Sequence, residues 1–161
     1  MLMDYQIRKS AKADMGSVLK LIKELAEFEK EAHQVEISVD DLIRDGFGEN
    51  AMFTCYLAET EEGIIGAALC YNRYSTWKGK TLHLEDLIVS EAYRGKGIGK
   101  ALYTRVLEHA WNQGVKRVEW NVLDWNSGAI DFYESTGAKV LRDWDTVQMN
   151  YKGLKSYLSK K

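Results

Sequence analysis

The chain has no proline among its 161 residues, and it has few cysteines and histidines. Because proline is missing, every sharp turn must be made by Gly, Asn, Asp or Ser, so the positions of the 13 glycines are informative. The two cysteines, Cys55 and Cys70, lie in apolar runs without C-x-x-C spacing, which favours buried thiols over metal ligands. The three histidines stand singly, so we predict no metal site.

Long hydrophobic runs are also absent. No stretch approaches the roughly 18 apolar residues of a membrane-spanning helix, and Asp4 and Arg8 stand where a signal peptide has its apolar run. The 22 Lys and Arg nearly balance the 24 Asp and Glu, without a basic stripe that favours nucleic acid. A content of 45% hydrophobic and 29% charged residues is globular. We expect one cytoplasmic domain over residues 1–161, with neither a membrane nor a nucleic-acid partner.

Hydrophobic periodicity predicts both strands and helices. Strand-like patterns cover residues 5–8, 53–58, 64–71, 81–89, 115–123, 140–141 and 146–151. Apolar spacings of three and four predict helices over 14–28, 39–45, 101–113 and 126–135. This order predicts an α/β domain in which a mixed, mostly antiparallel sheet of about six or seven strands has helices on both faces.

Helix-end signals accompany three of these segments. Asp14 is the expected N-cap of the first helix. Ser38 and Asp41 resemble a capping box with Asp in place of the usual Glu, and Gly46 is expected to end the helix that they open. Gly137 is expected to stop the helix over 126–135.

Three alternating glycines, Gly95, Gly97 and Gly99, lie directly before the third predicted helix. Glycine lets successive N–H groups turn into one concavity, and a helix N-terminus adds partial positive charge. With Arg94 and Lys96 beside it, this loop suits a pyrophosphate. The dinucleotide-binding motif G-x-G-x-x-G would need glycine at position 100, where this chain has Lys100. The G-K-[ST] sequence of a P-loop is also missing. The alternative interpretation is an ordinary glycine-rich surface turn.

A second motif lies about 30 residues further along the chain. Asn126, Ala129 and Tyr133 are spaced to share one helical face, and Gly137 follows. An ordinary core-facing helix is the alternative for this motif alone. Together, the two motifs resemble the GNAT family of N-acetyltransferases, whose acetyl-CoA loop reads R/Q-x-x-G-x-G/A and whose later helix reads N-x-x-A-x-x-F/Y-Y-x-x-x-G.

The resemblance implies an enzyme that uses acetyl-CoA as co-substrate and no metal. The cofactor-binding residues that it implies are Leu87, Ile88, Val89, Arg94, Gly95, Lys96, Gly97, Ile98, Gly99, Lys100, Asn126, Ala129 and Tyr133. By this resemblance the amides of residues 95–100 hold the pyrophosphate, and backbone groups of residues 87–89 pair with the pantetheine arm and help bind the thioester carbonyl. Tyr133 is implied to donate a proton or hydrogen bond to the departing thiolate, and Asn126 to bind the cofactor arm.

The acceptor amine must be neutral to attack a thioester. An alkylamine with a pKa near 10.4 is neutral in only about one part in 2,500 at pH 7, which corresponds to roughly 4.6 kcal/mol. Glu85 and Asp86 form a charged pair inside an apolar strand, where burial without purpose is expensive, and we favour Glu85 as the base or as the residue that positions a water. Adjacent strand residues point to opposite faces unless a bulge intervenes. A rim position is the alternative for either acid.

Acidic residues are concentrated in one part of the chain. Residues 24–50 contain nine of them, against Lys30 and Arg44. Taken individually, most of these acids are typical of a solvated helix face. As a group they produce a negative field that attracts a cationic acceptor.

Within the family, nearly the whole chain is similar to the spermidine/spermine and thialysine N-acetyltransferase branch. The matching runs are residues 21–26, 45–49, 84–86, 93–99, 126 and 132–133. The acceptor-site residues that this branch implies are Phe28, Glu29, Trp77, Glu85, Asp86 and Trp144. The branch also implies a homodimer with each acceptor site near the subunit interface. Ser75 and Thr76 replace the Asp-Pro of the polyamine enzymes, so one amine-binding acid is missing.

These observations predict acetyl transfer from acetyl-CoA to the primary amine of a small cationic acceptor, by direct attack in a ternary complex. The missing acid favours a short diamine or a lysine-like amine over a long polyamine. Two alternatives stay open: acetylation of a protein N-terminus or lysine, and a non-catalytic acyl-CoA-binding module that reports cofactor level to a partner.

Overall fold

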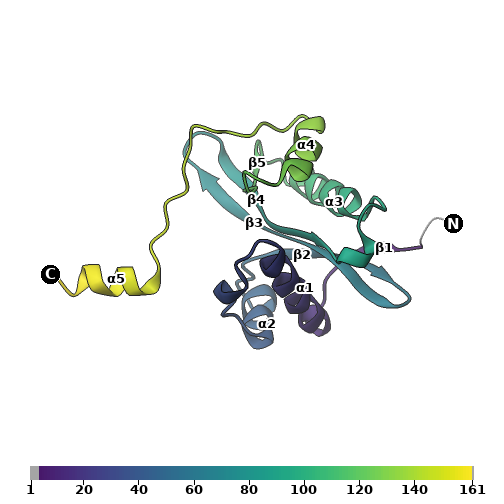
Figure 1. The fold of residues 1–161 in the computed structure, drawn as a ribbon, viewed down its shortest axis with the longest axis horizontal. Helices are drawn as coiled ribbons and strands as arrows, with labels where there is room; N and C mark the ends of the chain where they lie inside the picture. The colour runs from purple at the N-terminus through teal and green to yellow at the C-terminus, as the bar shows by residue number, and fades with distance from the viewer. Residues whose placement is uncertain (1–3, 161) are drawn as a thin grey trace. The chain divides into compact units, whose positions relative to one another are not determined.

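The computed structural model describes residues 4–160, which form two compact units divided between Asn121 and Val122. In the first unit, the described residues form a sheet in the order β1-β2-β3-β4-β5 (Figure 1). Its strands are β1 (Gln6–Lys9), β2 (Thr54–Thr60), β3 (Gly63–Ser75), β4 (Gly79–Val89) and β5 (Val118–Glu119). Neighbouring strands from β1 to β4 are antiparallel, and β5 is parallel to β4. The predicted mixed, mostly antiparallel sheet is confirmed, but it has five strands among the described residues where about six or seven were predicted.

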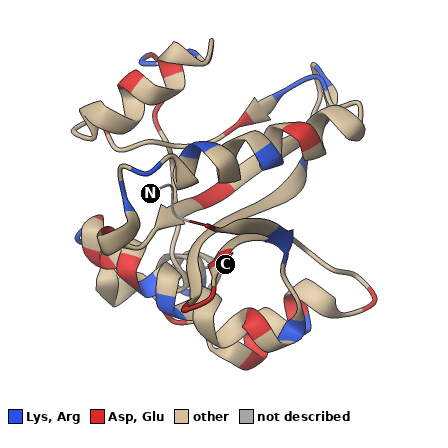
Figure 2. Ribbon diagram, turned by 90° about the vertical axis from the view of Figure 1, so that its right-hand side faces the viewer, with Lys and Arg blue, Asp and Glu red and all other residues tan. Residues whose placement is uncertain are grey.

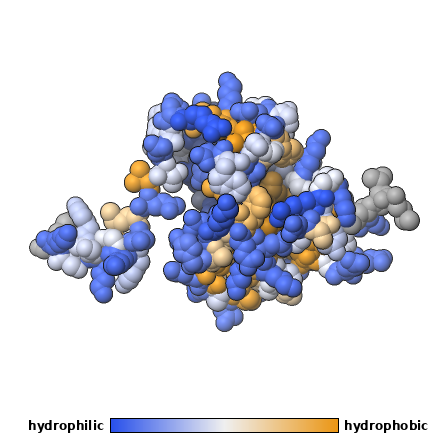
Figure 3. Space-filling view, viewed as in Figure 1, coloured by the Kyte–Doolittle hydropathy of each residue, from blue (hydrophilic) through white to orange (hydrophobic). Residues whose placement is uncertain are grey.

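Helices cover both faces of this sheet, as predicted (Figure 1). On one face α1 (Met15–Phe28) and α2 (Val39–Phe47) enclose a core of Met15, Val18, Leu21, Leu42, Cys55, Leu57, Ala67, Leu69 and Ile88. On the other face α3 (Ile98–Asn112) buries Ile98, Leu102, Tyr103, Val106 and Ala110. Short 3₁₀ turns cover Lys12–Asp14, Ala32–Gln34 and Glu91–Tyr93. Most of the surface visible in Figure 3 is hydrophilic, and none of the described helices is long and apolar enough to cross a membrane.

The fifth strand is much shorter than predicted, because both ends of the 115–123 segment have other hydrogen-bond partners. The N–H of Val115 donates to the carbonyl of Ala110 at 3.3 Å and so completes the exit from α3. The carbonyl of Leu123 accepts from the N–H of Asn126 at 3.0 Å, which closes a turn. Val118 and Glu119 pair with β4, and the carbonyl of Arg117 accepts from the N–H of Leu82 at 3.0 Å.

The second unit contains α4 (Ser127–Ser135) and α5 (Tyr151–Leu158). The predicted end of α4 is confirmed, since Gly137 follows it with a φ of +96°. The strands predicted over 140–141 and 146–151 are wrong, because the described residues of this unit form no strand. Asn150 instead starts α5 by accepting a hydrogen bond from the N–H of Gly153 at 2.9 Å. This cap favours a helix where the alternation of side chains predicted a strand.

The capping box of α2 is confirmed. The N–H of Asp41 donates to Ser38 Oγ at 3.2 Å, and the N–H of Ser38 donates to Asp41 Oδ2 at 2.8 Å. Gly46 does not end this helix, which continues to Phe47. A Cβ at Gly46 would collide with the ring of Phe53, so glycine is needed there for packing.

Asp14 occupies the predicted N-cap position of α1, but its side chain does not cap that helix. Its carboxylate accepts from the N–H of Ala11 at 2.7 Å and forms an ion pair with Arg8 at 2.7 Å. The hydrogen bond from Arg8 is the main reason that the pKa of Asp14 is lowered. Asp14 therefore joins the first strand to the turn before α1.

Candidate active site

The pairing of β3 with β4 contains a bulge at the two predicted acids. Leu69 pairs with Asp86 and Cys70 pairs with Leu84, so Glu85 is an extra residue on β4. Cross-strand partners share a face, and Leu69 belongs to the core beneath α1, so Asp86 lies on that face. Because a bulge breaks strict alternation, the two adjacent acids are not forced onto opposite faces.

The charges of two other carboxylates act on Asp86 at this bulge. Burial raises the pKa of Asp86 to about 6, and the negative charges of Glu85 and Glu29 contribute further. Glu29 is the C-cap residue of α1, and its own pKa is raised by burial and by the charge of Glu31. We call Glu29, Glu85 and Asp86 the carboxylate cluster. Repulsion among its members is relieved when a cation binds beside them, so the cluster suits a protonated amine.

Glu85 differs electrostatically from its neighbour Asp86. Its side chain is 51% exposed, and its Oε2 lies 3.4 Å from Nε2 of the buried His83. The hydrogen bond from His83 is the largest cause of the lowered pKa of Glu85, with burial acting in the opposite direction. Glu85 therefore stays ionised over a wider pH range, whereas Asp86 titrates closer to neutral pH.

The predicted pantetheine residues lie on an edge of β4. β5 pairs with β4 only at Leu82 and His83, so no strand of the described chain follows this edge from residue 84 to residue 89. On the opposite side, residues 87–89 pair with β3. An extended ligand with amide groups can add to such an edge through main-chain hydrogen bonds. Leu87, Ile88 and Val89 thus fit the role expected of them.

The glycine loop forms a turn that leads into α3. Gly95 and Gly97 have φ angles of +75° and +81°, in the left-handed region that glycine adopts without strain. Gly97 is the N-cap of α3, and the N–H of Ala101 makes the first helical bond to its carbonyl at 3.0 Å. The N–H groups of residues 98–100 precede that bond, which gives the loop the geometry of an anion cradle.

The basic residue before this loop links it to α1. Arg94 donates to the carbonyl of Val89 at 2.9 Å, and its guanidinium lies 5.2 Å from the ring centre of Phe28. Glu24 accepts hydrogen bonds from the N–H of Glu91 at 2.9 Å and the hydroxyl of Ser90 at 3.0 Å. The structure therefore brings Phe28 to the predicted cofactor loop, and it assigns Glu24 a supporting role that the sequence did not indicate.

Several acids of the 24–50 segment have local cationic partners. Arg44 pairs with Asp41 and Asp45, each at 2.8 Å. Figure 2 shows basic and acidic residues interspersed along the ribbon. Asp41 and Asp45 are therefore neutralised locally, whereas the charge of Glu29 acts on Asp86 of β4.

Trp77 is not brought to the carboxylate cluster of its own chain. It lies at the tip of the β3–β4 hairpin, where it is 77% exposed and its N–H donates to Ser75 Oγ at 3.1 Å. β4 starts at Gly79, and Glu85 lies six residues further along this strand. At about 3.3 Å per residue, the strand separates the hairpin tip from Glu85 by roughly 20 Å.

The second predicted motif lies on α4 of the second unit. Asn126 is the N-cap of this helix, and its Oδ1 accepts from the N–H of Ala129 at 3.3 Å. Tyr133 follows on the same helical face, with its ring centre 5.4 Å from that of Phe132. Trp144 lies in the segment between α4 and α5 and is 69% exposed. The motif thus forms the capped, two-turn helical stripe that its spacing predicts.

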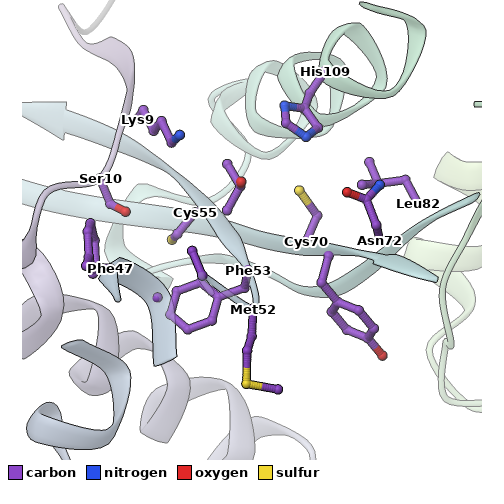
Figure 4. A pocket seen from close by; sticks show the side chains of 14 residues that line it. Lys9, Ser10, Phe47, Met52, Phe53, Cys55, Cys70, Asn72, Leu82 and His109 are labelled. Carbon is purple, nitrogen blue, oxygen red and sulfur yellow. The ribbon is translucent and has the colours of Figure 1, made fainter. Parts of the chain in front are cut away.

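Both cysteines line a hollow of about 420 Å³ with Lys9, Ser10, Phe47, Phe53, Asn72 and His109 (Figure 4). Burial raises the pKa of Cys55 to about 12 and that of Cys70 to about 11. Both are buried free thiols, as predicted. Because a nucleophilic cysteine must be a thiolate, neither is suited to carry an acetyl group.

The sequence reasoning missed the polar residues around Glu85. The sequence pattern predicts no role for His83, Tyr71 or Glu119 in acetyl transfer. His83 lies two residues before Glu85, which on a strand is the same-face spacing. That spacing is the sequence signal that could have linked His83 to Glu85. Tyr71 and Glu119 are recognised as cross-strand neighbours of His83 only from the strand pairing.

Comparison with known proteins identifies the family. Residues 18–138 match the acetyltransferase (GNAT) family. The chain is 42% identical to thialysine N-epsilon-acetyltransferase of Mus musculus over 86% of each protein. It is 39% identical to the human spermidine/spermine N(1)-acetyltransferase-like protein 1 over 84% of this chain and 21% of that protein. An integron cassette protein of V. cholerae shares the fold, with a TM-score of 0.78 and 24% identity over 99% of each chain. This chain therefore belongs to the GNAT family of acetyltransferases.

Proposed function

We propose that this acetyltransferase transfers the acetyl group of acetyl-CoA to the primary amine of a small cationic acceptor, by direct attack in a ternary complex. The observation that carries this proposal is the carboxylate cluster at the β4 bulge, in which the charges of Glu85 and Glu29 act on the buried Asp86. The inert thiols of Cys55 and Cys70 also favour direct attack over an acyl-cysteine route. Thialysine and ornithine acetyltransferases among the relatives support a lysine-like acceptor or a short diamine.

Acetyl-CoA fits the residues of the first unit. The N–H groups at the start of α3, with Arg94 and Lys96 nearby, suit its pyrophosphate, and the open edge of β4 suits its pantetheine amides. When bound, acetyl-CoA supplies the activated acetyl thioester. In the second unit we assign Asn126 and Ala129 to the cofactor arm and Tyr133 to the leaving sulfur, to which its hydroxyl donates.

The carboxylates have two tasks, binding the ammonium form and removing its proton. Glu85, ionised and half-exposed, is suited to face the amine and to take the proton directly or through a water. Asp86, with a pKa of about 6, is the stronger base of the pair and the second candidate for the same step. Glu29 adds negative charge that retains the cationic acceptor.

The position of Trp77 supports a homodimer. Trp77 is proposed to flank an acceptor site, yet roughly 20 Å of β4 separates its hairpin from Glu85 of the same chain. Trp77 therefore flanks the acceptor site of the partner, and each site lies near the subunit interface. Trp144 is proposed to flank an acceptor site as well. We further propose a single acetyltransferase domain over residues 1–161, acting in the cytoplasm.

An amine panel tests this function. Free-thiol release from acetyl-CoA is measured with lysine, thialysine, ornithine, putrescine, spermidine and an N-terminal peptide. We expect turnover with the small cationic amines and the highest kcat/KM for a lysine-like or short diamine acceptor. Preference for the peptide would support protein acetylation, and tight acetyl-CoA binding without amine-dependent thiol release would support a binding module. Either outcome would overturn the proposal.

A further inference from the structure

His83 is a buried polar side chain at the centre of the sheet, 6% exposed. It pairs with Tyr71 on β3 and with Glu119 on β5. The next residue but one along β4 is Glu85. A buried imidazole in such a position needs partners for both ring nitrogens.

The partners of His83 determine which nitrogen carries the proton. Nδ1 lies 3.2 Å from Nη1 of Arg73, and Nε2 lies 3.4 Å from Oε2 of Glu85. A guanidinium only donates, so Nδ1 must accept. The ring proton is therefore on Nε2, the nitrogen that faces Oε2 of Glu85.

Arg73 is itself held in place from the neighbouring strand. Its Nη1 lies 2.5 Å from Oε1 of Glu119, and Oε2 of Glu119 lies 2.6 Å from Nε of Arg117. A continuous series of polar contacts thus runs from Arg117 through Glu119, Arg73 and His83 to Glu85. Since a guanidinium has donors and no acceptor, the direction of the hydrogen bond from Arg73 to His83 cannot reverse.

We propose that His83 is a positioning residue that holds the Glu85 carboxylate toward the acceptor amine through its Nε2–H, and that Arg73 imposes this tautomer. The proposal rests on the function proposed above, in which Glu85 meets the amine. His83 is not a proton relay, because Arg73 occupies the nitrogen through which a second proton would leave. The lowered pKa of Glu85, with His83 as its largest cause, agrees with this role.

Other charged and titratable groups surround the same carboxylate. Tyr71 and Arg73 on β3 act on Glu85 itself, and Glu85 acts on Asp86 of β4. Further out, Glu119 pairs with Arg73 and Arg117 around β5, and Glu29 at the end of α1 acts on Asp86. Tyr71 is a second donor to Glu85, and burial and the charge of Glu85 raise its pKa. His83 differs from Tyr71 because its other ring nitrogen, Nδ1, contacts Arg73, which is itself held by the ion pair with Glu119.

The first test reads the tautomer directly and requires no catalysis. We measure the ¹⁵N shifts of His83 by NMR in the full chain, in Arg73→Met and in Arg117→Met. We expect the Nε2–H tautomer in the wild type and in Arg117→Met, which leaves Arg73 beside His83. In Arg73→Met we expect a shift towards a mixture of tautomers. An Nδ1–H tautomer in the wild type, or no change in Arg73→Met, would overturn the assignment.

The second test compares His83→Leu with His83→Gln, whose amide can still donate. We expect His83→Leu to lower the amine kcat/KM about tenfold or more and to move its acidic limb to higher pH, with the KM for acetyl-CoA unchanged. His83→Gln should recover most of the loss. Equal losses in both variants would contradict the proposal. If the wild type acetylates no amine, the proposed function fails. The role of His83 is then tested separately, because ¹³C titration of Glu85 in the two variants shows whether a hydrogen-bond donor at position 83 sets the ionisation of Glu85.

Discussion

Two adjacent acids acquire opposite properties because one residue is inserted into β4. Asp86 faces the core side beneath α1 and is hard to ionise, whereas Glu85 remains half-exposed and receives a hydrogen bond from His83. The sequence could identify this charged pair as unusual, and it could state that a bulge would be needed. It could not locate the bulge, because the register depends on the pairing of β3 with β4.

Asp86→Asn should stabilise the protein at high pH. The pKa of Asp86 in the folded protein, about 6, is above the ordinary value of 3.8. The contribution of Asp86 to the free energy of unfolding is therefore most favourable below pH 3.8 and is lost as the pH rises through 6. Above pH 7 this unfavourable ionisation corresponds to about 3 kcal/mol. The free energy of unfolding of Asp86→Asn, from urea titrations, should exceed that of the wild type at pH 8 and approach it at pH 4.

A difference between the two proteins that does not vary with pH would contradict this account of Asp86. The same variant should have a reduced amine kcat/KM, since a group that is costly for folding is retained for its chemistry.

Tyr133→Phe should lower kcat more than it weakens acetyl-CoA binding. The substitution removes only the hydroxyl that is proposed to donate to the leaving sulfur. Steady-state kinetics with acetyl-CoA as the varied substrate measure both parameters, and an unchanged kcat would remove the role assigned to Tyr133.

At the scale of elements, the glycine loop and α3 form the part of the site that the sequence predicted most fully. The spacing of the glycines, the helix behind them and the strand before them are all present. Predictions failed where a local hydrogen bond outweighed side-chain alternation, as at Asn150, or where glycine served packing, as at Gly46. At Gly46 the deciding contact is with Phe53, which lies outside the helical pattern. At Asn150 the helix cap competes with the strand pattern of the same residues.

Gly97→Ala should destabilise the protein by about 1 kcal/mol, because a side chain at this left-handed N-cap position is strained. It should also raise the KM for acetyl-CoA. Gly99→Ala is the matched control for stability, since its φ is not in the left-handed region and its Cβ would meet Val89 at an ordinary 3.7 Å. Urea denaturation should separate the two variants, and equal destabilisation would show that backbone strain at Gly97 is not the cause.

At the scale of the whole molecule, the two motifs of the family lie in different compact units, one on β4 and α3 and the other on α4. Linear order and spacing were enough to recognise the family, because both motifs are local. They could not show that the hairpin tip that carries Trp77 lies far from Glu85 of the same chain. That separation follows from the length of the β3–β4 hairpin, and it is the reason for proposing a shared site.

Mixed dimers test this sharing. Glu85→Gln and Trp77→Ala subunits should each have low activity when alone. When the two are mixed and allowed to exchange, one of the two sites in a heterodimer combines an intact Glu85 with an intact Trp77. Activity should therefore rise above that of either variant, and an absence of recovery despite confirmed exchange would place Trp77 outside the partner's site.

The central claim is that the carboxylates at the β4 bulge bind and deprotonate a small cationic amine. Its most direct test is the pH dependence of amine kcat/KM for the wild type, Glu85→Gln and the control Glu61→Gln, an exposed acid in the β2–β3 turn. We expect Glu85→Gln to lose about 100-fold or more, with an unchanged KM for acetyl-CoA, and Glu61→Gln to match the wild type. Wild-type kcat/KM and an unaltered pH profile in Glu85→Gln would contradict the claim.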